Sequence, residues 1–161
     1  MSKDSGLENA IALAKQCHAG QVDKAGKPYI DHPLRVMAAL PSLEEKIVGV
    51  LHDAVEDSDL TLDQLRDLGF SDPVIQALDA ITKRPGEDYE QYLQRVMENA
   101  IALGVKIADM TDNMDISRIP QPTEKDYRRL QKYQQVLPRL KSKEAGFLFS
   151  QITIILGGFD W

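Results

Sequence analysis

Residues 51–57 read L-H-D-A-V-E-D, directly after the apolar residues I-V-G-V at 47–50. No proline interrupts the segment from Ser42 to Asp57, which predicts one helix with a buried side. At about 100° per residue, the ionisable side chains of this helix share an arc of roughly 140°, and apolar side chains fill the opposite side. The four ionisable residues are His52, Asp53, Glu56 and Asp57.

These four groups make divalent-metal binding the first hypothesis for the helix. Ionisable side chains are costly to bury on an otherwise apolar helix unless something binds them, and a divalent cation does so directly. The alternative is a solvated helix end, where acidic residues are common. A metal site therefore requires further ligands from elsewhere in the chain.

The composition is that of an ordinary globular protein of 161 residues, which predicts a single domain over 1–161 with its core at about 5–140. A net charge of −6 disfavours a nucleic-acid surface but permits a local basic pocket for an anionic small molecule. Cys17 is the only cysteine, so no disulfide is expected within the chain. Without a signal-peptide pattern or an apolar run long enough to span a bilayer, the expectation is a cytoplasmic protein that binds no membrane.

Helical periodicity and capping residues predict an all-α fold. Helices are expected over residues 5–19, 34–40, 42–57, 61–69, 74–82, 88–102, 105–115 and 123–140, the last with a kink near Pro138. The segment 21–33, rich in Gly, Pro and Lys, is expected to be an ordered loop. The apolar tail 146–161 leaves three alternatives open: a final helix, a packed strand, or a subunit contact in a homo-oligomer.

Two further residues complete a candidate metal site. His32 directly precedes Pro33, which would open the next helix, and Asp109 lies in the middle of an apolar helix, where a carboxylate needs a partner. Two imidazoles and two carboxylates with open coordination positions suit Mn, Fe, Zn or Mg, unlike a Cys-rich structural zinc site. The predicted ligands are His32, His52, Asp53 and Asp109.

This ligand set favours hydrolysis of a phosphoester or phosphoanhydride, because a metal with open positions can lower the pKa of a bound water and polarise a phosphoryl oxygen. Glu56 and Asp57 lie one turn beyond the His-Asp pair, where they can orient water or carry the proton of the leaving group. Arg129 and Tyr133 are four residues apart on the last helix and can face one pocket together. A solvent-facing pair is the alternative for these two residues.

Five ordered segments resemble the HD-type hydrolase domain of the RelA/SpoT homologues, and especially the stand-alone small alarmone hydrolases. They are A-K-Q-C-H-A-G-Q at 14–21, G-K-P-Y-I-D-H-P at 26–33, H-D-A-V-E-D at 52–57, I-T-K at 81–83 and V-K-I-A-D-M-T-D-N at 105–113. Each segment is a weak signal alone, but the ordered set is specific. The resemblance covers roughly residues 9–133.

The resemblance implies an all-α, single-domain HD-type helical bundle. It implies manganese-dependent removal of the 3′-pyrophosphate from guanosine 3′,5′-bis(diphosphate) and its pentaphosphate, giving GDP or GTP plus pyrophosphate. It assigns metal binding, by Mn²⁺ or another divalent cation, to His32, His52, Asp53 and Asp109, and names Glu56 and Asp57 as the catalytic acids. It assigns substrate contacts to Lys24, Asn113, Arg129 and Tyr133, and a structural role to His18.

Three positions depart from the family pattern. Asp23 stands where the family usually has an arginine beside the purine. Met110 and Asp112 replace a basic residue and an aromatic residue or histidine of the last motif. Because the metal set is intact, the departures concern recognition of the base. Two other functions therefore remain alternatives: a phosphohydrolase of another nucleotide, such as NADPH or a dNTP, and a non-catalytic nucleotide-sensing module.

Overall fold

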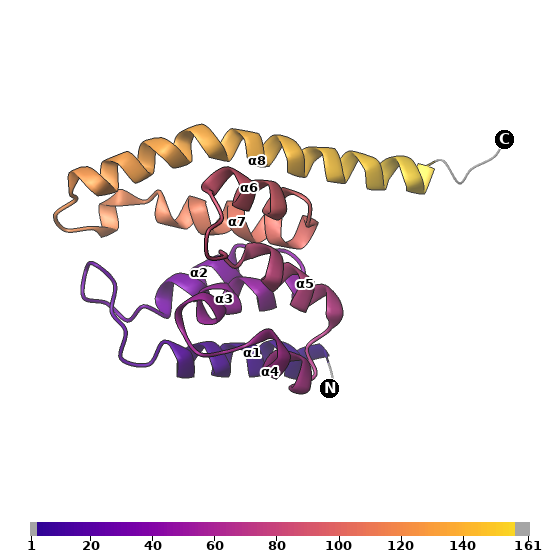
Figure 1. Ribbon diagram of the computed structural model, residues 1–161, viewed down its shortest axis with the longest axis horizontal. Helices are drawn as coiled ribbons and strands as arrows, with labels where there is room; N and C mark the ends of the chain where they lie inside the picture. The colour runs from indigo at the N-terminus through magenta and orange to yellow at the C-terminus, as the bar shows by residue number, and fades with distance from the viewer. Residues whose placement is uncertain (1–2, 157–161) are drawn as a thin grey trace.

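The computed structural model describes residues 3–156 and is all-helical over that range, apart from an isolated bridge between Val22 and Pro28 (Figure 1). The all-α prediction is confirmed. The elements are α1 (Lys3–Cys17), α2 (Asp31–Ala38), α3 (Leu43–Asp57), α4 (Leu62–Asp67), α5 (Asp72–Ile81), α6 (Tyr89–Met97), α7 (Ala100–Asn113), the 3₁₀ helix η1 (Ile116–Arg118) and α8 (Glu124–Leu156).

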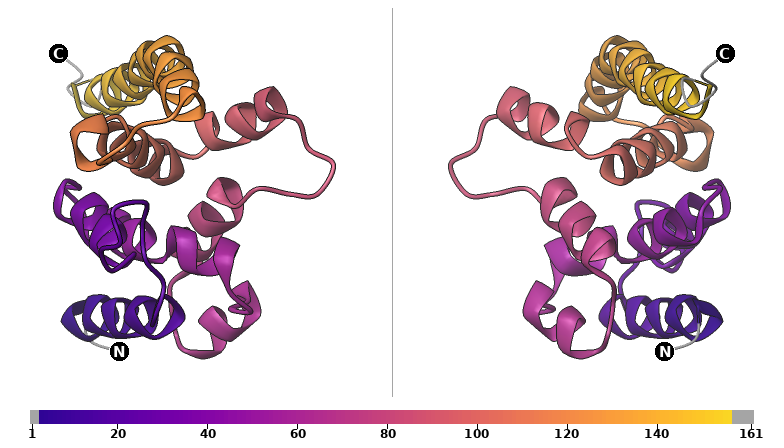
Figure 2. Two further views of the ribbon diagram at one scale, coloured as in Figure 1. Left: turned by 90° about the vertical axis from the view of Figure 1, so that its left-hand side faces the viewer. Right: turned by 90° about the vertical axis from the view of Figure 1, so that its right-hand side faces the viewer.

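Helix α3 lies at the centre of the molecule and packs against α1, α2, α5 and α7. Figures 1 and 2 show α1 and α4 on one side of it and α6, α7 and α8 on the other. Val48, Val50 and Leu51 of α3 are completely buried and belong to one continuous apolar core. Because neighbours cover α3 on several sides, His52 in its C-terminal half is buried and Asp53 is half-buried, whereas Glu56 and Asp57 at its end are exposed.

Capping boxes set the start of α3, α4 and α6. At α3 the Ser42 hydroxyl accepts a hydrogen bond from the Glu45 amide at 3.2 Å, and the Glu45 carboxylate accepts one from the Ser42 amide at 3.1 Å. Two backbone N–H groups that the helix leaves unpaired are satisfied in this way. The predicted helix over 42–57 is confirmed to within one residue.

Several other predicted boundaries are wrong. The segment 88–102 is two helices, because the Asn99 side chain accepts a hydrogen bond from the Ala102 amide at 2.9 Å and begins α7 at Ala100. Gly104 therefore lies inside α7, where a Cβ atom would be only 2.6 Å from the Glu45 carboxylate of α3. The second helix begins at Asp31 instead of residue 34, so that His32 lies in the first turn of α2.

The last helix extends well beyond its predicted end at residue 140. It continues through Pro138 to Leu156, so the described part of the tail is helical, and residues 157–161 lie outside the described range. Its far half extends past the rest of the bundle (Figure 1), and Leu148, Phe149 and Ile152 are more than half exposed there. None of the helices between residues 3 and 156 combines the length and apolar character that a bilayer span requires.

We expect Ser42→Ala to lower the free energy of unfolding by about 1 kcal/mol, because the first turn of α3 loses a side-chain cap. Ser71→Ala is the matched control, since Ser71 occupies the N-cap position of α5 without making a side-chain capping bond. Urea unfolding followed by circular dichroism measures both. Equal losses in the two variants would contradict a specific role for the α3 cap.

Candidate metal centre

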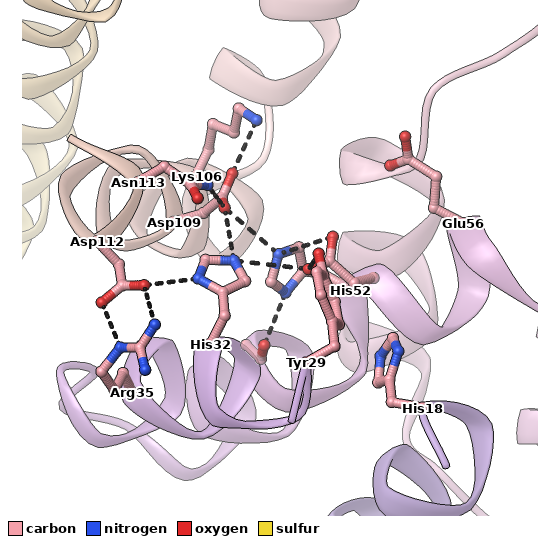
Figure 3. A network of polar contacts seen from close by, with 12 residues as sticks. His18, Tyr29, His32, Arg35, His52, Glu56, Lys106, Asp109, Asp112 and Asn113 are labelled. Carbon is pink, nitrogen blue, oxygen red and sulfur yellow. Dashed lines mark hydrogen bonds and ion pairs between the residues drawn. The ribbon is translucent and has the colours of Figure 1, made fainter. Parts of the chain in front are cut away.

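The four predicted ligands lie close together between α2, α3 and α7. Figure 3 shows three of them, His32, His52 and Asp109. Asp109 Oδ1 lies 3.1 Å from His32 Nε2 and 3.7 Å from His52 Nε2. Asp53 Oδ2 lies 3.5 Å from His32 Nε2, and Asp53 Oδ1 lies 3.3 Å from His52 Nε2. One ligand atom each from His32, His52 and Asp109 falls within 4.8 Å of the others, and all three residues are buried. These three side chains can therefore bind a single cation, and Asp53, which lies beside both histidines, stays a predicted fourth ligand.

Hydrogen bonds fix which nitrogen of each imidazole faces the centre. The Nδ1–H of His52 donates to the carbonyl of Gly49 at 2.7 Å, one turn back on α3. The Nδ1–H of His32 donates to Asp112 Oδ2 at 2.6 Å. Since the proton is held on Nδ1 in both rings, each neutral imidazole presents the lone pair of Nε2 to the centre, as metal-binding histidines do.

Asp109 divides its two oxygens between different partners. Oδ1 faces the histidines and also accepts a hydrogen bond from the Asn113 amide at 2.8 Å. Oδ2 accepts one from the buried Lys106 ammonium at 2.9 Å. Lys106 therefore leaves Oδ1 as the oxygen that is directed at the metal position.

The chemistry of the metal-free site supports a cation there. Burial alone would lower the pKa of His52, but the charges of Asp53 and Asp109 outweigh burial and raise it to about 9. The pKa of His32 is also raised, because hydrogen bonds to Asp109 and Asp112 outweigh its burial. The Nε2 atom of His52 is buried and has no hydrogen-bond partner among the described residues. A divalent cation would satisfy this nitrogen and replace the protons that the carboxylates otherwise draw onto the imidazoles.

The metal centre opens into a small polar cavity of about 110 Å³, which we call the inner cavity. Glu56 lines it, and Lys83 lies 3.4 Å from a Glu56 oxygen. Two of the predicted substrate-contacting residues, Tyr133 and Asn113, also line it. The full lining is Tyr29, His32, His52, Asp53, Glu56, Ile81, Lys83, Tyr92, Lys106, Asp109, Asn113 and Tyr133.

A second cavity of about 360 Å³, the outer cavity, shares Tyr29, His32 and Asn113 with the inner one. Two predicted substrate residues, Lys24 and Arg129, line this outer cavity. The remaining residues on its wall are Val22, Asp23, Ala25, Arg35, Asp112, Asp115, Arg118 and Ile119. The two cavities therefore form adjacent compartments around the predicted ligand His32.

A buried carboxylate, Asp126, holds the two cations of the outer cavity in place. Lys24 forms an ion pair with Asp126, and Arg129 Nη2 lies 3.5 Å from the same carboxylate. Asp126 also accepts a hydrogen bond from the Thr123 amide at 2.9 Å at the start of α8. These contacts connect the loop after α1 to α8.

Asp57 and His18 lie outside the lining of the inner cavity. Asp57 lies at the end of α3, where its side chain is only partly covered. This partial burial and the charge of Asp53 raise the pKa of Asp57. His18 is buried, with Nδ1 2.8 Å from Gln21 Oε1 and its ring 5.0 Å from that of Tyr29. The geometry thus brings Glu56, but not Asp57, to the wall of the metal cavity.

Three residues that support the ligands were not assigned by the sequence. Tyr29 donates a hydrogen bond to Asp53 Oδ2 at 2.8 Å, and Asp112 binds both His32 and the guanidinium of Arg35. Lys106 precedes Asp109 by three residues on a buried helix. This spacing predicts an ion pair between the two side chains, so the sequence could have identified Lys106 as a partner of Asp109. The Asp112–His32 pair joins residues 80 positions apart, and no local pattern indicates it.

A larger groove of about 940 Å³ lies between α7, the far half of α8 and the segment joining α2 to α3. None of the four predicted ligands lines it. The candidate site is therefore distinguished by its cluster of ionisable groups and not by the size of its cavity.

Comparisons with known proteins identify relatives of the chain, although no family model matches it. The chain is 37% identical over 125 residues to the GTP pyrophosphokinase of Streptomyces coelicolor, which covers 70% of this chain and 15% of that protein. It is 30% identical over 120 residues to the guanosine-3′,5′-bis(diphosphate) 3′-pyrophosphohydrolase of Aquifex aeolicus, covering 67% of this chain and 17% of that protein. The chain thus spans less than a fifth of the length of these curated relatives.

The fold is similar to that of a solved metazoan ortholog of SpoT, described as hydrolysing ppGpp and playing a role in starvation responses. The TM-score is 0.69 at 19% sequence identity, over 91% of this chain and 96% of that chain. This likeness covers almost the whole of both chains, so it supports the helical architecture throughout.

We expect metal binding to strengthen with pH. In the metal-free protein the pKa of His52 lies above its ordinary value of 6.5. Protonation of His52 therefore stabilises the fold fully below about pH 6.5, and this stabilisation is lost as the pH rises through about 9. A bound metal needs neutral imidazoles, so binding releases protons in the same window. Thermal unfolding with and without Mn²⁺ should show a stabilisation that grows from pH 6 to pH 8.5. A stabilisation independent of pH would contradict the assignment.

We expect Asp112→Asn to weaken Mn²⁺ binding about tenfold to a hundredfold, because the carboxylate that orients His32 loses its charge. Asp115→Asn is the matched control: Asp115 also pairs with Arg118 but makes no contact with a predicted ligand. Calorimetric titration of metal-free protein with Mn²⁺ measures both affinities. Unchanged affinity in Asp112→Asn, with the control equal to wild type, would show that the pair is dispensable for metal binding.

Proposed function

This chain belongs to the HD-type hydrolase domains of the RelA/SpoT homologues, and we propose that it shares their reaction. The proposed reaction removes the 3′-pyrophosphate of guanosine 3′,5′-bis(diphosphate) and its pentaphosphate. The geometry of the inner cavity supports the proposal. The products are GDP or GTP and pyrophosphate. The observation that carries the proposal is the convergence of His32, His52, Asp53 and Asp109 in a cavity that Glu56 also lines.

The proposed cofactor is Mn²⁺, held by His32, His52, Asp53 and Asp109. Mixed nitrogen and oxygen ligation suits Mn²⁺, and the same donors are compatible with other divalent cations. When bound, such a cation supplies Lewis-acid polarisation of a phosphoryl oxygen and lowers the pKa of water. The arrangement of the remaining residues then determines which bond is cleaved.

In the reaction an oxygen–phosphorus bond forms to water, and the bond between the ribose 3′-oxygen and phosphorus breaks. Glu56 is the proposed group that accepts a proton from the attacking water and returns one to the ribose oxygen. Lys83, 3.4 Å from Glu56, contributes positive charge next to the developing negative charge on phosphate. Asp57, outside the cavity lining, is proposed to act on the proton at longer range through its charge.

The outer cavity is proposed to hold the nucleoside and its 5′-phosphates. Lys24, Arg129, Arg35 and Arg118 lie on its wall, and such cations suit an anionic ligand. Asn113 and Tyr133 line the inner cavity, and they are the proposed contacts of the ribose and of the phosphate that is attacked. The protein is thus proposed to bind a guanosine polyphosphate across two adjoining compartments.

Hydrolysis of another nucleotide, NADPH or a dNTP, is the second candidate function. The observation that favours it is Asp23 on the wall of the outer cavity, where the family pattern has an arginine. A substrate panel at equal concentrations, with Mn²⁺ present, separates the two candidates by their kcat/KM values. Much faster turnover of NADPH or a dNTP would replace the guanosine tetraphosphate as the proposed substrate.

We expect the purified protein to release pyrophosphate from guanosine 3′,5′-bis(diphosphate) in the presence of Mn²⁺. Asp109→Ala should remove this activity because the metal loses a buried ligand, and Glu56→Gln should lower kcat by at least about 100-fold because proton transfer is lost. Asp79→Asn is the control, since Asp79 is an exposed carboxylate paired with Arg84 away from the cavity.

Nucleotide binding without turnover in any divalent metal would favour a sensing module instead. In that case wild type itself would show no turnover, so Asp109→Ala could be compared with it only by nucleotide binding. Retained nucleotide binding by this variant would then show that the outer cavity binds independently of the metal.

A further inference from the structure

The loop 82–88 joins α5 to α6 at the edge of the molecule and brings Lys83 to the wall of the inner cavity (Figure 2). Residues 83–86 of this loop are exposed. The Lys83 side chain is itself 58% exposed, yet its ammonium lies 3.4 Å from the Glu56 carboxylate. A long, exposed side chain gains little from one ion pair, because screening and lost rotamer freedom offset the attraction. The backbone of the loop therefore has to direct Lys83 toward the cavity.

Arg95 of α6 lies behind this loop, and each of its three guanidinium nitrogens donates hydrogen bonds to α5 or to the loop. Nη1 donates to the carbonyls of Asp79 at 2.8 Å and Ala80 at 2.6 Å. Nη2 donates to the Thr82 carbonyl at 3.0 Å and to the Glu87 carboxylate, which also accepts a bond from Nε at 2.9 Å. The carbonyls at the end of a helix have no partner in a following turn. Arg95 thus supplies partners at the end of α5 and fixes where the loop leaves the helix.

The two peptide groups that flank Lys83 are both held by the pair of Arg95 and Glu87. The Thr82 carbonyl, which belongs to the peptide group before Lys83, accepts the hydrogen bond from Arg95. The Arg84 amide, which belongs to the peptide group after Lys83, donates to the Glu87 carboxylate at 3.3 Å. Because each peptide group is planar, holding both of them restricts the φ and ψ angles of Lys83. The direction in which the Lys83 side chain leaves the backbone is set in this way.

The pair of Arg95 and Glu87 is largely covered, unlike the lysine that it supports. The two side chains are 15% and 14% exposed, so solvent screens their attraction only weakly. The Arg95 guanidinium also lies 5.6 Å from the centroid of the Tyr92 ring. Tyr92 lines the inner cavity, and its hydroxyl donates to the Ile81 carbonyl at 2.9 Å. Helix α6 therefore forms part of the cavity wall and braces the loop beside it.

We propose that Arg95 is a positioning residue: together with Glu87 it holds the backbone of Lys83, so that the Lys83 ammonium faces Glu56 and the phosphate that is attacked. Arg95 lines neither the inner nor the outer cavity, so it acts on the reaction through Lys83. Its effect on turnover rests on the proposed function, whereas its effect on the order of the loop does not.

A double-mutant cycle tests the proposal on whichever nucleotide the wild-type protein hydrolyses fastest with Mn²⁺. We expect Lys83→Gln to lower kcat about tenfold with little change in KM, because Lys83 acts on charge that develops during the reaction. Arg95→Lys keeps the charge but not the fork of donors, and it should lower kcat about threefold to tenfold. The double variant should have the kcat of Lys83→Gln alone, because Arg95 then has no lysine to position.

A purely structural role of Arg95 gives a different result in the same cycle. Arg95→Lys would then lower kcat by the same factor whether or not Lys83 is present. Such additivity would overturn the proposal.

Amide hydrogen exchange measured by mass spectrometry gives a second readout that needs no turnover. In Arg95→Lys we expect residues 82–88 to exchange at least about tenfold faster than in wild type, while α3 keeps its wild-type rate. Arg139→Lys is the matched control. Arg139 of α8 also binds a carboxylate of α6, that of Glu90, through two N–H groups, but it lines neither cavity. Wild-type exchange of the loop in Arg95→Lys would overturn the proposal.

Glu87→Gln is the milder variant if Arg95→Lys lowers the melting temperature too far for kinetics. It removes the negative charge of the pair but keeps one acceptor oxygen, so kcat should fall less than in Arg95→Lys, and again only when Lys83 is present.

The measurements also separate this proposal from the proposed function. If no nucleotide is hydrolysed, the proposed function fails, and hydrogen exchange alone decides whether Arg95 holds the loop. If the guanosine tetraphosphate is hydrolysed equally well by Arg95→Lys and wild type, the function stands and the positioning role fails.

Discussion

Asp109 is a carboxylate in the middle of a buried helix, and its charge is compensated from three directions. His32 of α2 and His52 of α3 face one oxygen, and Lys106 of α7 binds the other. Burial alone would raise the pKa of Asp109, but Lys106 and the two histidines hold it well below its usual range. A buried charge without such partners would cost several kcal/mol. The packing of α2 and α3 against α7 is therefore tied to the ionisation of the site.

Much of the central architecture could be predicted because the signals are local. The α3 helix has a capping residue at its start, an apolar period along its length and an acidic end, all within 16 residues. The boundary between α6 and α7 could not be predicted as readily, since the cap at Asn99 is followed directly by an apolar run that continues the helical period. The tail after residue 146 is rich in β-branched and aromatic residues, so its propensity conflicts with the helix that it joins.

The candidate site shows the same division between local and distant information. The four predicted ligands could be proposed because each belongs to a recognisable segment and the segments occur in a family order, and three of them, His32, His52 and Asp109, lie close enough to share an ion. The contacts that orient them could not, because Tyr29 reaches Asp53 and Asp112 reaches His32 only after α2, α3 and α7 have packed. Likewise, the pairing of Lys24 and Arg129 with Asp126 depends on where α8 begins.

The structure assigns two of the three departures from the family pattern to definite contacts. Asp112 accepts hydrogen bonds from His32, a predicted metal ligand, and from Arg35. Asp23 accepts hydrogen bonds from the Ala25 and Lys27 amides at 2.8 and 2.9 Å, which fold the loop between the first two helices. Its oxygen Oδ1 is therefore already engaged by the backbone. Under the proposed function, recognition of the base is therefore expected to change chiefly because the arginine is absent: the outer cavity lacks a cation that could stack on a purine.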